Sequence, residues 1–351
     1  MKHRLTKLTA AVLAALILAG CSGGAPEEAP EEPPVPENAE TTWTLAVGQP
    51  EGSTCWDAAE QFASALSDAT EGAVAVEVQP VPIDRPTSLE QTVAGIVDLY
   101  LDSSLIYGSY GSKEELERPF FSVTMPFLFP DAETAAEVLD GTGGEALNGI
   151  LAELGLQGLA YGELGFRYPT TSEGRAVTAP EDLNGLKIRT AGMLEVAVAY
   201  VDCWGAELYP SSYSDVMTPL AAGDYDGQES TLAEADYQTV QTDVTIFPAF
   251  YEPAIFTMNG DLYESLSPDL REIVDRCARE AMADQRLRNR EQETEILERW
   301  QEDGITVHVL TEEQCSAFQA LTDRLYDPED PDHQDWFADC TPEWVAQFRP
   351  S

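Results

Sequence analysis

Basic residues are scarce in this chain of 351 residues. It has 19 lysines and arginines against 63 aspartates and glutamates, which gives a formal net charge of −44 at pH 7. Such a polyanion repels the phosphate backbone of nucleic acids, so nucleic acid is excluded as a partner. The charge also repels small anions at long range, so an anion site in this chain needs a local group of positive side chains. We interpret the general acidity as a means of staying soluble in the protein's environment.

Metal-binding and catalytic motifs are also missing from the sequence. Only three histidines occur, at His3, His308 and His333, and no CxxC or His-rich spacing indicates zinc. The chain has no GxSxG, GxGxxG, Walker or HExxH motif. Paired carboxylates carry little information, because 63 acidic residues produce such pairs by chance. We therefore expect no cofactor, no metal and no enzymatic activity.

The apolar run at Leu8–Leu18 is too short to span a bilayer stably, and no other segment is apolar enough to cross one. The run follows Lys2, Arg4 and Lys7 and precedes Leu18-Ala19-Gly20-Cys21. This arrangement is similar to a bacterial lipoprotein signal, in which residues 1–20 are removed and Cys21 carries the lipid. The alternative is an uncleaved membrane anchor. We expect the mature chain to be soluble and lipid-anchored at the extracytoplasmic face of the cell membrane, in the cell envelope or periplasm.

Residues 21–42 form the next segment, which is rich in proline and glutamate. It has little apolar surface to bury, and its like charges and prolines favour an extended, disordered chain. We predict that it is a tether between the lipid and the folded part.

Five cysteines follow Cys21, and a secreted protein can form disulfides. They are Cys55, Cys203, Cys277, Cys315 and Cys340. Their odd number leaves at least one thiol free or paired with another chain. A bridge between Cys55 and Cys203 is one possibility, and buried thiols or other pairings are the alternatives; the sequence does not decide between them.

Strands and helices alternate along the chain, which predicts an α/β fold with a largely parallel sheet and helices on both faces. The strand at Trp43–Gly48, the helix at Asp57–Thr70 and the strand at Val74–Val78 form the first β-α-β unit. Further strands are expected at Val97–Leu101, Gln157–Tyr161, Leu186–Thr190 and Ile255–Asn259. Further helices are expected at Leu89–Gly95, at Ala135–Leu154 with an interruption at Gly141–Gly144, at Met193–Trp204 and at Ser214–Ala222.

One much longer helix is predicted from Pro268 to about Glu302, with Ser267 as its N-cap. At 1.5 Å per residue it is ~50 Å long. A domain of ~120 residues is narrower than that. The helix must therefore contact both domains or project beyond one of them.

Four short motifs follow one another in a fixed order between Arg167 and Thr231. They are Gly165-Phe166-Arg167, then Asp182-Leu183-Asn184-Gly185-Leu186-Lys187-Ile188-Arg189, then Pro210-Ser211-Ser212-Tyr213-Ser214-Asp215-Val216, and finally Gly223-Asp224-Tyr225-Asp226-Gly227-Gln228-Glu229. In this order they resemble the DctP-type extracytoplasmic solute-binding subunits of TRAP transporters, the tripartite carriers of organic acids. The resemblance covers residues 43 to about 300.

The resemblance implies a two-domain periplasmic-binding-protein-like fold in which a long helix contacts both domains. We expect domain I at 43–165 with about 255–295, and domain II at 166–254 with about 296–351. The implied function is to capture a small organic acid, a carboxylate, and to deliver it to the TRAP-type permease subunits in the membrane. Alternatives are a binding protein or sensor subunit of another transporter class, or an extracellular enzyme with catalytic carboxylates.

Arg189 is the first candidate ligand residue. A guanidinium is permanently charged and matches a carboxylate with two parallel hydrogen bonds. Arg189 ends a predicted strand, and ligands bind at strand ends in open α/β sheets. The alternative is a structural ion pair. In the family the matching arginine binds the ligand carboxylate, and the residue matching Arg167 adds a second contact; the alternative for Arg167 is a surface turn.

The resemblance implies four further ligand residues. Tyr213 matches an aromatic that packs near the ligand, although it could be a core aromatic. Ser230 stands where many relatives carry a ligand-binding Asn, and serine lacks the amide donor pair of that residue. Ser103 follows a predicted strand where relatives place a polar ligand contact. Trp56 could line the cleft or pack at the start of a helix.

Overall fold

The computed structural model describes residues 39–81, 84–108, 120, 122–172, 174–192, 194–211, 215–236, 240–336 and 341–348. The predicted signal peptide with Cys21 lies outside these ranges, as do Tyr213, Cys340 and the predicted tether up to residue 38. The first strand begins at Thr41, within the last two residues assigned to the tether.

The first half of the structure begins with two parallel β-α-β units. Its strands are β1 (Thr41–Val47), β2 (Val74–Pro80) and β3 (Leu99–Ser103), and its helices are α1 (Thr54–Ala69) and α2 (Arg85–Val93). β1 pairs in parallel with both β2 and β3. α1 starts where Ser53 accepts a hydrogen bond from the backbone amide of Trp56 at 3.2 Å. The predicted alternation of strands and helices is confirmed here.

Two long strands run between the two halves. β4 (Leu156–Thr171) and β9 (Phe250–Asn259) pair antiparallel, and β9 also pairs antiparallel with β3. The expectation of a largely parallel sheet is therefore wrong at its centre, where the sheet is mixed. The physical reason is the path of the chain: β4 leads into the second half and β9 returns beside it, so the two must run in opposite directions.

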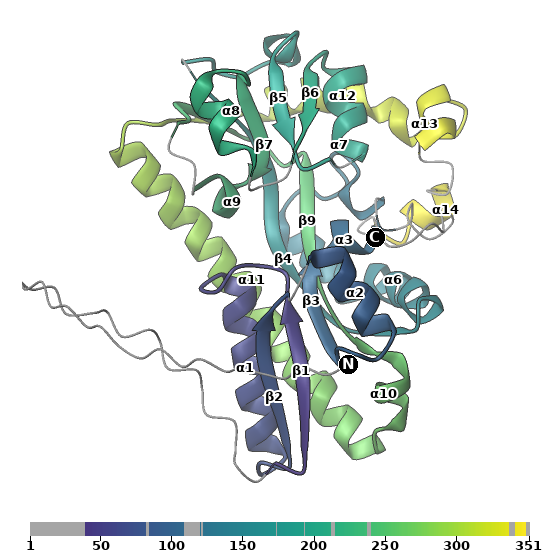
Figure 1. The fold of residues 1–351 in the computed structure, drawn as a ribbon. Helices are drawn as coiled ribbons and strands as arrows, with labels where there is room; N and C mark the ends of the chain where they lie inside the picture. The colour runs from purple at the N-terminus through teal and green to yellow at the C-terminus, as the bar shows by residue number, and fades with distance from the viewer. Residues whose placement is uncertain are drawn as a thin grey trace, which may run out of the picture. The chain divides into compact units, whose positions relative to one another are not determined.

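The second half continues the same sheet. β7 (Gly227–Thr231) pairs antiparallel with β4 and parallel with β5 (Lys187–Thr190), which pairs in parallel with β6 (Glu207–Pro210). The order is β2-β1-β3-β9-β4-β7-β5-β6 (Figure 1). β8 (Asp243–Ile246) joins β4 at the side and pairs with β10 (Thr306–Val309).

Helices contact the strands of this sheet in both halves. Those of the second half include α7 (Leu194–Val198), α8 (Met217–Ala222), α9 (Leu232–Asp236) and α12 (Glu312–Thr322). Further helices are α3 (Ser104–Gly108), α5 (Ala132–Leu139), α6 (Thr142–Glu153), α10 (Gly260–Ser265), α13 (Pro331–Trp336) and α14 (Pro342–Val345). The predicted interruption of the helix at 135–154 is confirmed: α5 ends at Leu139 and α6 begins at Thr142, slightly before the predicted break at Gly141–Gly144.

The long helix α11 (Pro268–Glu302) has the predicted bounds. The Ser267 side chain caps it by accepting a hydrogen bond from the backbone amide of Leu270 at 3.3 Å. α11 packs on α1 and β4 and also contacts α9 and β10. It therefore touches elements of both halves, which confirms the two-domain arrangement with a shared long helix.

The end of the described chain returns to the first half. Thr142, at the start of α6, donates a hydrogen bond to the carbonyl of Gln347 at 2.9 Å, and Trp344 Nε1 donates to Ser122 Oγ at 2.6 Å. Val345 and Phe348 are buried there. The sequence analysis had placed residues 296–351 in domain II. The boundaries between domains I and II stay a prediction, because one sheet runs through both halves.

The described cysteines carry no disulfide. Cys55 and Cys277 are buried and Cys203 and Cys315 are half-buried, all as free thiols. Cys55 and Cys203 are therefore free thiols and do not form the bridge that the sequence left open. Within the described ranges, no helix combines the length and apolar character that crossing a bilayer requires.

Candidate functional site

Arg189 lies at the carboxyl end of β5 with 2% of its surface exposed. Its Nε and Nη2 both donate to the main-chain carbonyl of Ser211, while its buried Nη1 has no hydrogen-bond partner. Among the described residues no carboxylate lies within 4.0 Å of this guanidinium, so it lacks a direct counter-ion. Burial lowers the pKa of Arg189, and the nearby charge of Arg167 lowers it further.

Arg167, in β4, is buried in a network of carboxylates. Its Nε pairs with Glu229 of β7 and its Nη1 with Glu252 of β9. Its Nη2 donates to the carboxylate and the carbonyl of Glu229 at 3.2 and 3.3 Å. Burial alone lowers the pKa of Arg167, but the two glutamates outweigh it and hold the pKa above its ordinary value. Arg167 is thus not in a surface turn, and its guanidinium is already engaged.

The two candidate serines extend this network. Ser103 Oγ, at the end of β3, donates to Glu252, the carboxylate that also accepts from Arg167. Ser230 Oγ, in β7, donates to Glu234 of α9 at 2.7 Å. Glu234 lies in turn 3.7 Å from Arg167 Nη1. The structure therefore brings Arg167, Ser103 and Ser230 together through shared carboxylates contributed by β7, β9 and α9.

Trp56 is placed differently from these residues. It is buried in the core of the first half, with its Nε1 donating to Glu60 at 2.9 Å. Its neighbour Cys55 lines the pocket described next, whereas Trp56 is absent from the lining. This placement corresponds to the packing alternative, and a contact of Trp56 with the ligand stays a prediction. Tyr213 lies outside the described residues.

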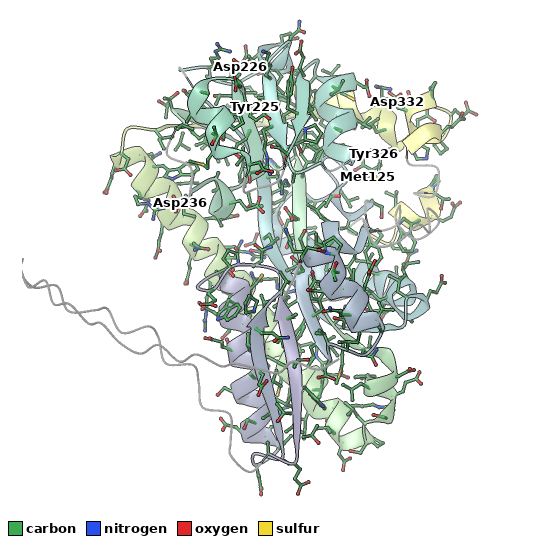
Figure 2. The ribbon with its side chains drawn as sticks, viewed as in Figure 1. Met125, Tyr225, Asp226, Asp236, Tyr326 and Asp332 are labelled. Carbon is green, nitrogen blue, oxygen red and sulfur yellow. The ribbon has the colours of Figure 1, made fainter. Side chains whose placement is uncertain are left out.

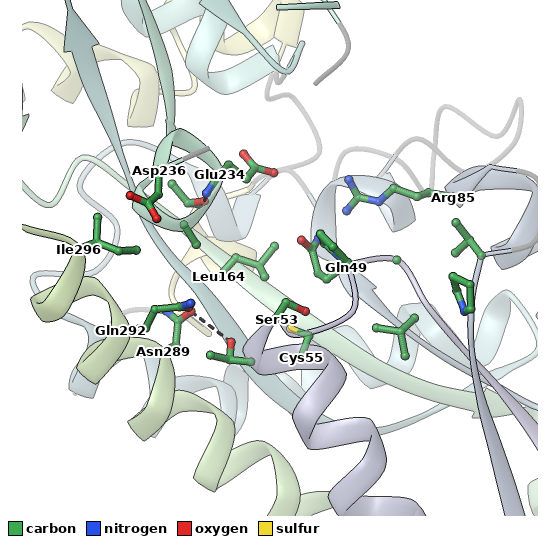
Figure 3. A pocket seen from close by; sticks show the side chains of 18 residues that line it. Gln49, Ser53, Cys55, Arg85, Leu164, Glu234, Asp236, Asn289, Gln292 and Ile296 are labelled. Atoms are coloured by element: carbon green, nitrogen blue, oxygen red, sulfur yellow. Dashed lines mark hydrogen bonds between the residues drawn. The ribbon is translucent and has the colours of Figure 1, made fainter. Parts of the chain in front are cut away.

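A pocket of about 440 Å³ opens beside this network. Loops at the ends of β1 and β2 form one side, and α9, α11 and β4 form the other (Figure 3). Its lining includes Gln49, Ser53, Cys55, Arg85, Leu164, Thr231, Glu234, Asp236, Asn289, Gln292 and Ile296. Its volume suits a small ligand, and its lining combines apolar side chains with a few polar groups.

Arg85 is the cation of the described lining, and the sequence analysis did not single it out. Its Nε donates to Asp102 Oδ2 at 2.8 Å, and its Nη2 pairs with Asp102 Oδ1. Tyr100 donates to the same carboxylate at 2.5 Å. A Cβ on Gly48 would collide with Asp102, so only glycine fits at the end of β1. The sequence held a signal for Arg85: basic residues are scarce in this chain, and Arg85 is one that follows a predicted strand.

Two acidic residues of α9 face the pocket. Asp236 lies next to α11 (Figure 2), where it pairs with Arg299 and accepts a hydrogen bond from Trp300 Nε1 at 2.8 Å. Glu234 has no such close cation partner, although its charge acts on Arg85, Arg167 and Arg189 alike. Glu234 is therefore the carboxylate that a bound molecule in this pocket would meet.

Unpartnered buried amides accompany the unpartnered guanidinium. Asn289 lines the pocket with 2% exposure, and its Nδ2 donates to no protein group. Gln228, which pairs in register with Arg189, has neither amide atom satisfied. Buried polar groups are rarely left in this state, so these atoms are candidates for contacts with a ligand or with water. Within the described ranges no three His, Cys, Asp or Glu side chains cluster as a metal site.

The fold and the site define a two-domain α/β solute-binding protein. Residues 45–330 match the model of the DctP family, described as bacterial extracellular solute-binding protein, family 7. The match spans most of the chain, and the chain belongs to this family, as its motifs predicted.

Individual relatives agree with this assignment. The chain is 29% identical to the 2,3-diketo-L-gulonate-binding periplasmic protein YiaO of Escherichia coli, over 77% of this chain and 81% of that protein. It is 26% identical to the C4-dicarboxylate-binding periplasmic protein DctP of Rhodobacter capsulatus, over 77% and 80%. The crystal structure of a TRAP periplasmic solute-binding protein from Ochrobactrum anthropi superposes with a TM-score of 0.79 at 28% identity, covering 88% of this chain and 94% of that one.

Proposed function

We propose that this chain captures a small organic acid through Arg189 and delivers it to a TRAP-type permease. The observation that carries the proposal is the buried guanidinium of Arg189, which Ser211 orients and which has no counter-ion among the described residues. A buried charge of this kind is costly unless something pairs with it, and a ligand carboxylate matches its free edge. The named ligands of the Escherichia coli and Rhodobacter capsulatus relatives are carboxylates, which supports this chemistry.

The other candidate residues have supporting roles in this proposal. Arg167, held by Glu229 and Glu252, contributes a fixed positive charge near the ligand carboxylate. Ser103 and Ser230 lie in the same network and contact the ligand through their hydroxyl groups, with Tyr213 packing against it. Because Arg189 is almost fully buried, the ligand enters while the two halves are apart and is enclosed when they close.

The proposal also covers location and chemistry. A lipid on Cys21 holds the protein at the extracytoplasmic face of the membrane, and the segment that follows separates the folded part from the lipid. The protein binds and releases its ligand unchanged, without catalysis. Members of its family are extracellular solute-binding proteins, which supports this view.

The test combines native mass spectrometry with calorimetry. A small acid that co-purifies is identified by mass and then titrated into the wild type and into Arg189→Ala. Without a co-purified acid, succinate and 2,3-diketo-L-gulonate are titrated. Loss of a buried charge partner costs roughly 2–5 kcal/mol, so affinity should fall about thirtyfold to several thousandfold. Arg276→Ala, on the exposed face of α11, is the matched control and should bind like the wild type. Unchanged affinity in Arg189→Ala would place the anion site elsewhere.

A further inference from the structure

The charged groups around the pocket are nearly all paired with one another. Arg85 is held by Asp102 through two contacts. Arg167 is held by Glu229 and Glu252. These two clusters leave no free guanidinium for a ligand, because each cation already has a carboxylate at contact distance.

Two charged groups stand apart from these pairs. Among the described residues, Arg189 has no carboxylate within 4.0 Å. Glu234 makes one loose ion pair, 3.7 Å from Arg167 Nη1, and Glu229 and Glu252 already hold that cation more closely. The Glu234 side chain keeps 23% of its surface exposed and lines the pocket, where Arg85 extends from the other side (Figure 3). Arg189 is not among the residues that line the pocket, but the charge of Glu234 acts on it. Arg189 and Glu234 thus offer one cation to receive an anion and one carboxylate to receive hydrogen-bond donors.

We infer that the ligand carries a single carboxylate, bound by Arg189, and a far end that donates hydrogen bonds to Glu234. This inference rests on the proposed function and narrows its ligand class, since the named ligands of the relatives include both a sugar acid and C4-dicarboxylates. Among the residues that the structure describes, a second carboxylate at the far end would face Glu234 without an unpaired cation to offset the repulsion. Like charges placed together in a binding site cost several kcal/mol, which excludes dicarboxylates.

The protonation state of the network does not alter this balance. Burial raises the pKa of Glu252, which favours its neutral form. With Glu252 neutral, three cations still stand against three carboxylates. The cations are Arg85, Arg167 and Arg189, and the carboxylates are Asp102, Glu229 and Glu234. Arg189 is neutralised by the ligand's first carboxylate, so in either state a second carboxylate finds no unpaired cation within the described ranges.

The remainder of the lining fits hydroxyl groups along the ligand. Asn289 presents a buried Nδ2 without a partner, which can donate to a hydroxyl oxygen. Gln49, Ser53 and Gln292 add neutral donors and acceptors, while Leu164 and Ile296 are apolar. This chemistry matches a short hydroxylated monocarboxylate. An ω-amino acid also carries hydrogen-bond donors at its far end, in the form of an ammonium group. The experiment below distinguishes hydroxyl donors from ammonium donors.

The experiment compares acids that share a carbon skeleton and differ at one end. D-gluconate is paired with D-glucarate, and L-threonate with L-tartrate; γ-aminobutyrate is paired with succinate as the ammonium arm. Affinities are measured by calorimetry on the purified wild-type protein. The monocarboxylate of at least one pair should bind about tenfold or more tightly than its dicarboxylate. A preference in the gluconate or threonate pair identifies a hydroxyl group as the donor to Glu234. A preference in the γ-aminobutyrate pair identifies an ammonium group.

Glu234→Gln tests the origin of the preference. The substitution removes the negative charge and keeps the size, so the monocarboxylate-to-dicarboxylate ratio should fall about tenfold. Glu298→Gln, at an exposed position of α11, is the control and should keep the wild-type ratio. A dicarboxylate that binds the wild type more tightly than its partner, with binding lost in Arg189→Ala, overturns this inference and leaves the proposed function intact. If no acid of either series binds, both fail.

Discussion

Arg189 donates two hydrogen bonds to the main-chain carbonyl of Ser211, from Nε at 3.1 Å and from Nη2 at 2.7 Å. Both bonds use one edge of the guanidinium, which fixes the plane of the group. The Nη1 atom on the other side remains without a partner. The main chain therefore orients the arginine and leaves one side of it available for an anion.

Arg189→Lys should bind the ligand more weakly than the wild type and more tightly than Arg189→Ala. Lysine keeps the positive charge but cannot make two bonds to Ser211 and still present a planar edge to a carboxylate. We expect a loss of about ten- to a hundredfold in affinity by calorimetry. Thermal melting of the ligand-free variants is the control. A large drop in melting temperature without ligand would identify Arg189 as a structural residue.

Arg167→Leu should destabilise the ligand-free protein strongly. The substitution leaves Glu229 and Glu252 buried and without their cation, and breaking a buried ion pair in this way costs about 3–5 kcal/mol. Urea denaturation measures the free energy of unfolding. A triple variant that adds Glu229→Gln and Glu252→Gln should recover much of the loss, because no charge then remains unpaired. A single variant as stable as the wild type would contradict the network.

The free energy of unfolding should decrease as the pH rises toward 8, because of Glu293. Burial and the neighbouring charge of Glu163 raise the pKa of Glu293 from 4.5 to about 8. Between these values the folded state holds a proton that the unfolded state has lost, so unfolding becomes easier as the pH rises. This loss of stability is complete above about pH 8 and absent below about pH 4.5. It amounts to roughly a few kcal/mol.

Glu293→Gln should remove this dependence, because the amide stays neutral at every pH. Its melting temperature should exceed that of the wild type at pH 8 and match it near pH 5. The site is tight, since a Cβ on Gly165, whose φ is +98°, would collide with Glu293 Oε1. Exposed Glu295→Gln is the control and should melt like the wild type at both pH values. Equal melting of Glu293→Gln and wild type at pH 8 would argue against a raised pKa.

Ligand binding should reduce the radius of gyration. Arg189 is 2% exposed, so a ligand reaches it only from a more open arrangement of the two halves. Small-angle scattering with and without saturating ligand measures the change. Arg189→Ala at the same ligand concentration is the control and should keep the ligand-free curve. Identical curves for the wild type in both conditions would indicate a rigid protein.

Cys21 should carry a diacylglycerol in the protein isolated from cells, with residues 1–20 removed. The prediction rests on the short apolar run in front of Leu18-Ala19-Gly20-Cys21. Mass spectrometry of the intact protein and of its N-terminal peptide gives the answer. Cys21→Ser should release the protein from the membrane fraction. A chain that still begins at Met1 would refute the processing.

Local patterns in the sequence predicted many elements of the fold but not all of them, since β7, β8 and β10 were not predicted. The first β-α-β unit and the whole of α11 follow from apolar periodicity, Ser267 and Pro268, because helix formation depends on residues three and four apart. The motifs around Arg167 and Arg189 identified the family for the same reason, since each is a short run in a fixed order. The mixed centre of the sheet could not be predicted in this way, because strand direction depends on where the chain returns.

The partners of the site residues were decided by tertiary structure. Arg167 meets Glu229 and Glu252, which are 62 and 85 residues further along the chain. The sequence suggested a second ligand arginine there, and only the pairing of β4 with both β7 and β9 shows that two carboxylates already hold its guanidinium. With 63 acidic residues, the sequence alone cannot say which carboxylate lies beside which arginine. That choice is made by the strand order, because two buried charges pair only where neighbouring strands hold them within contact distance.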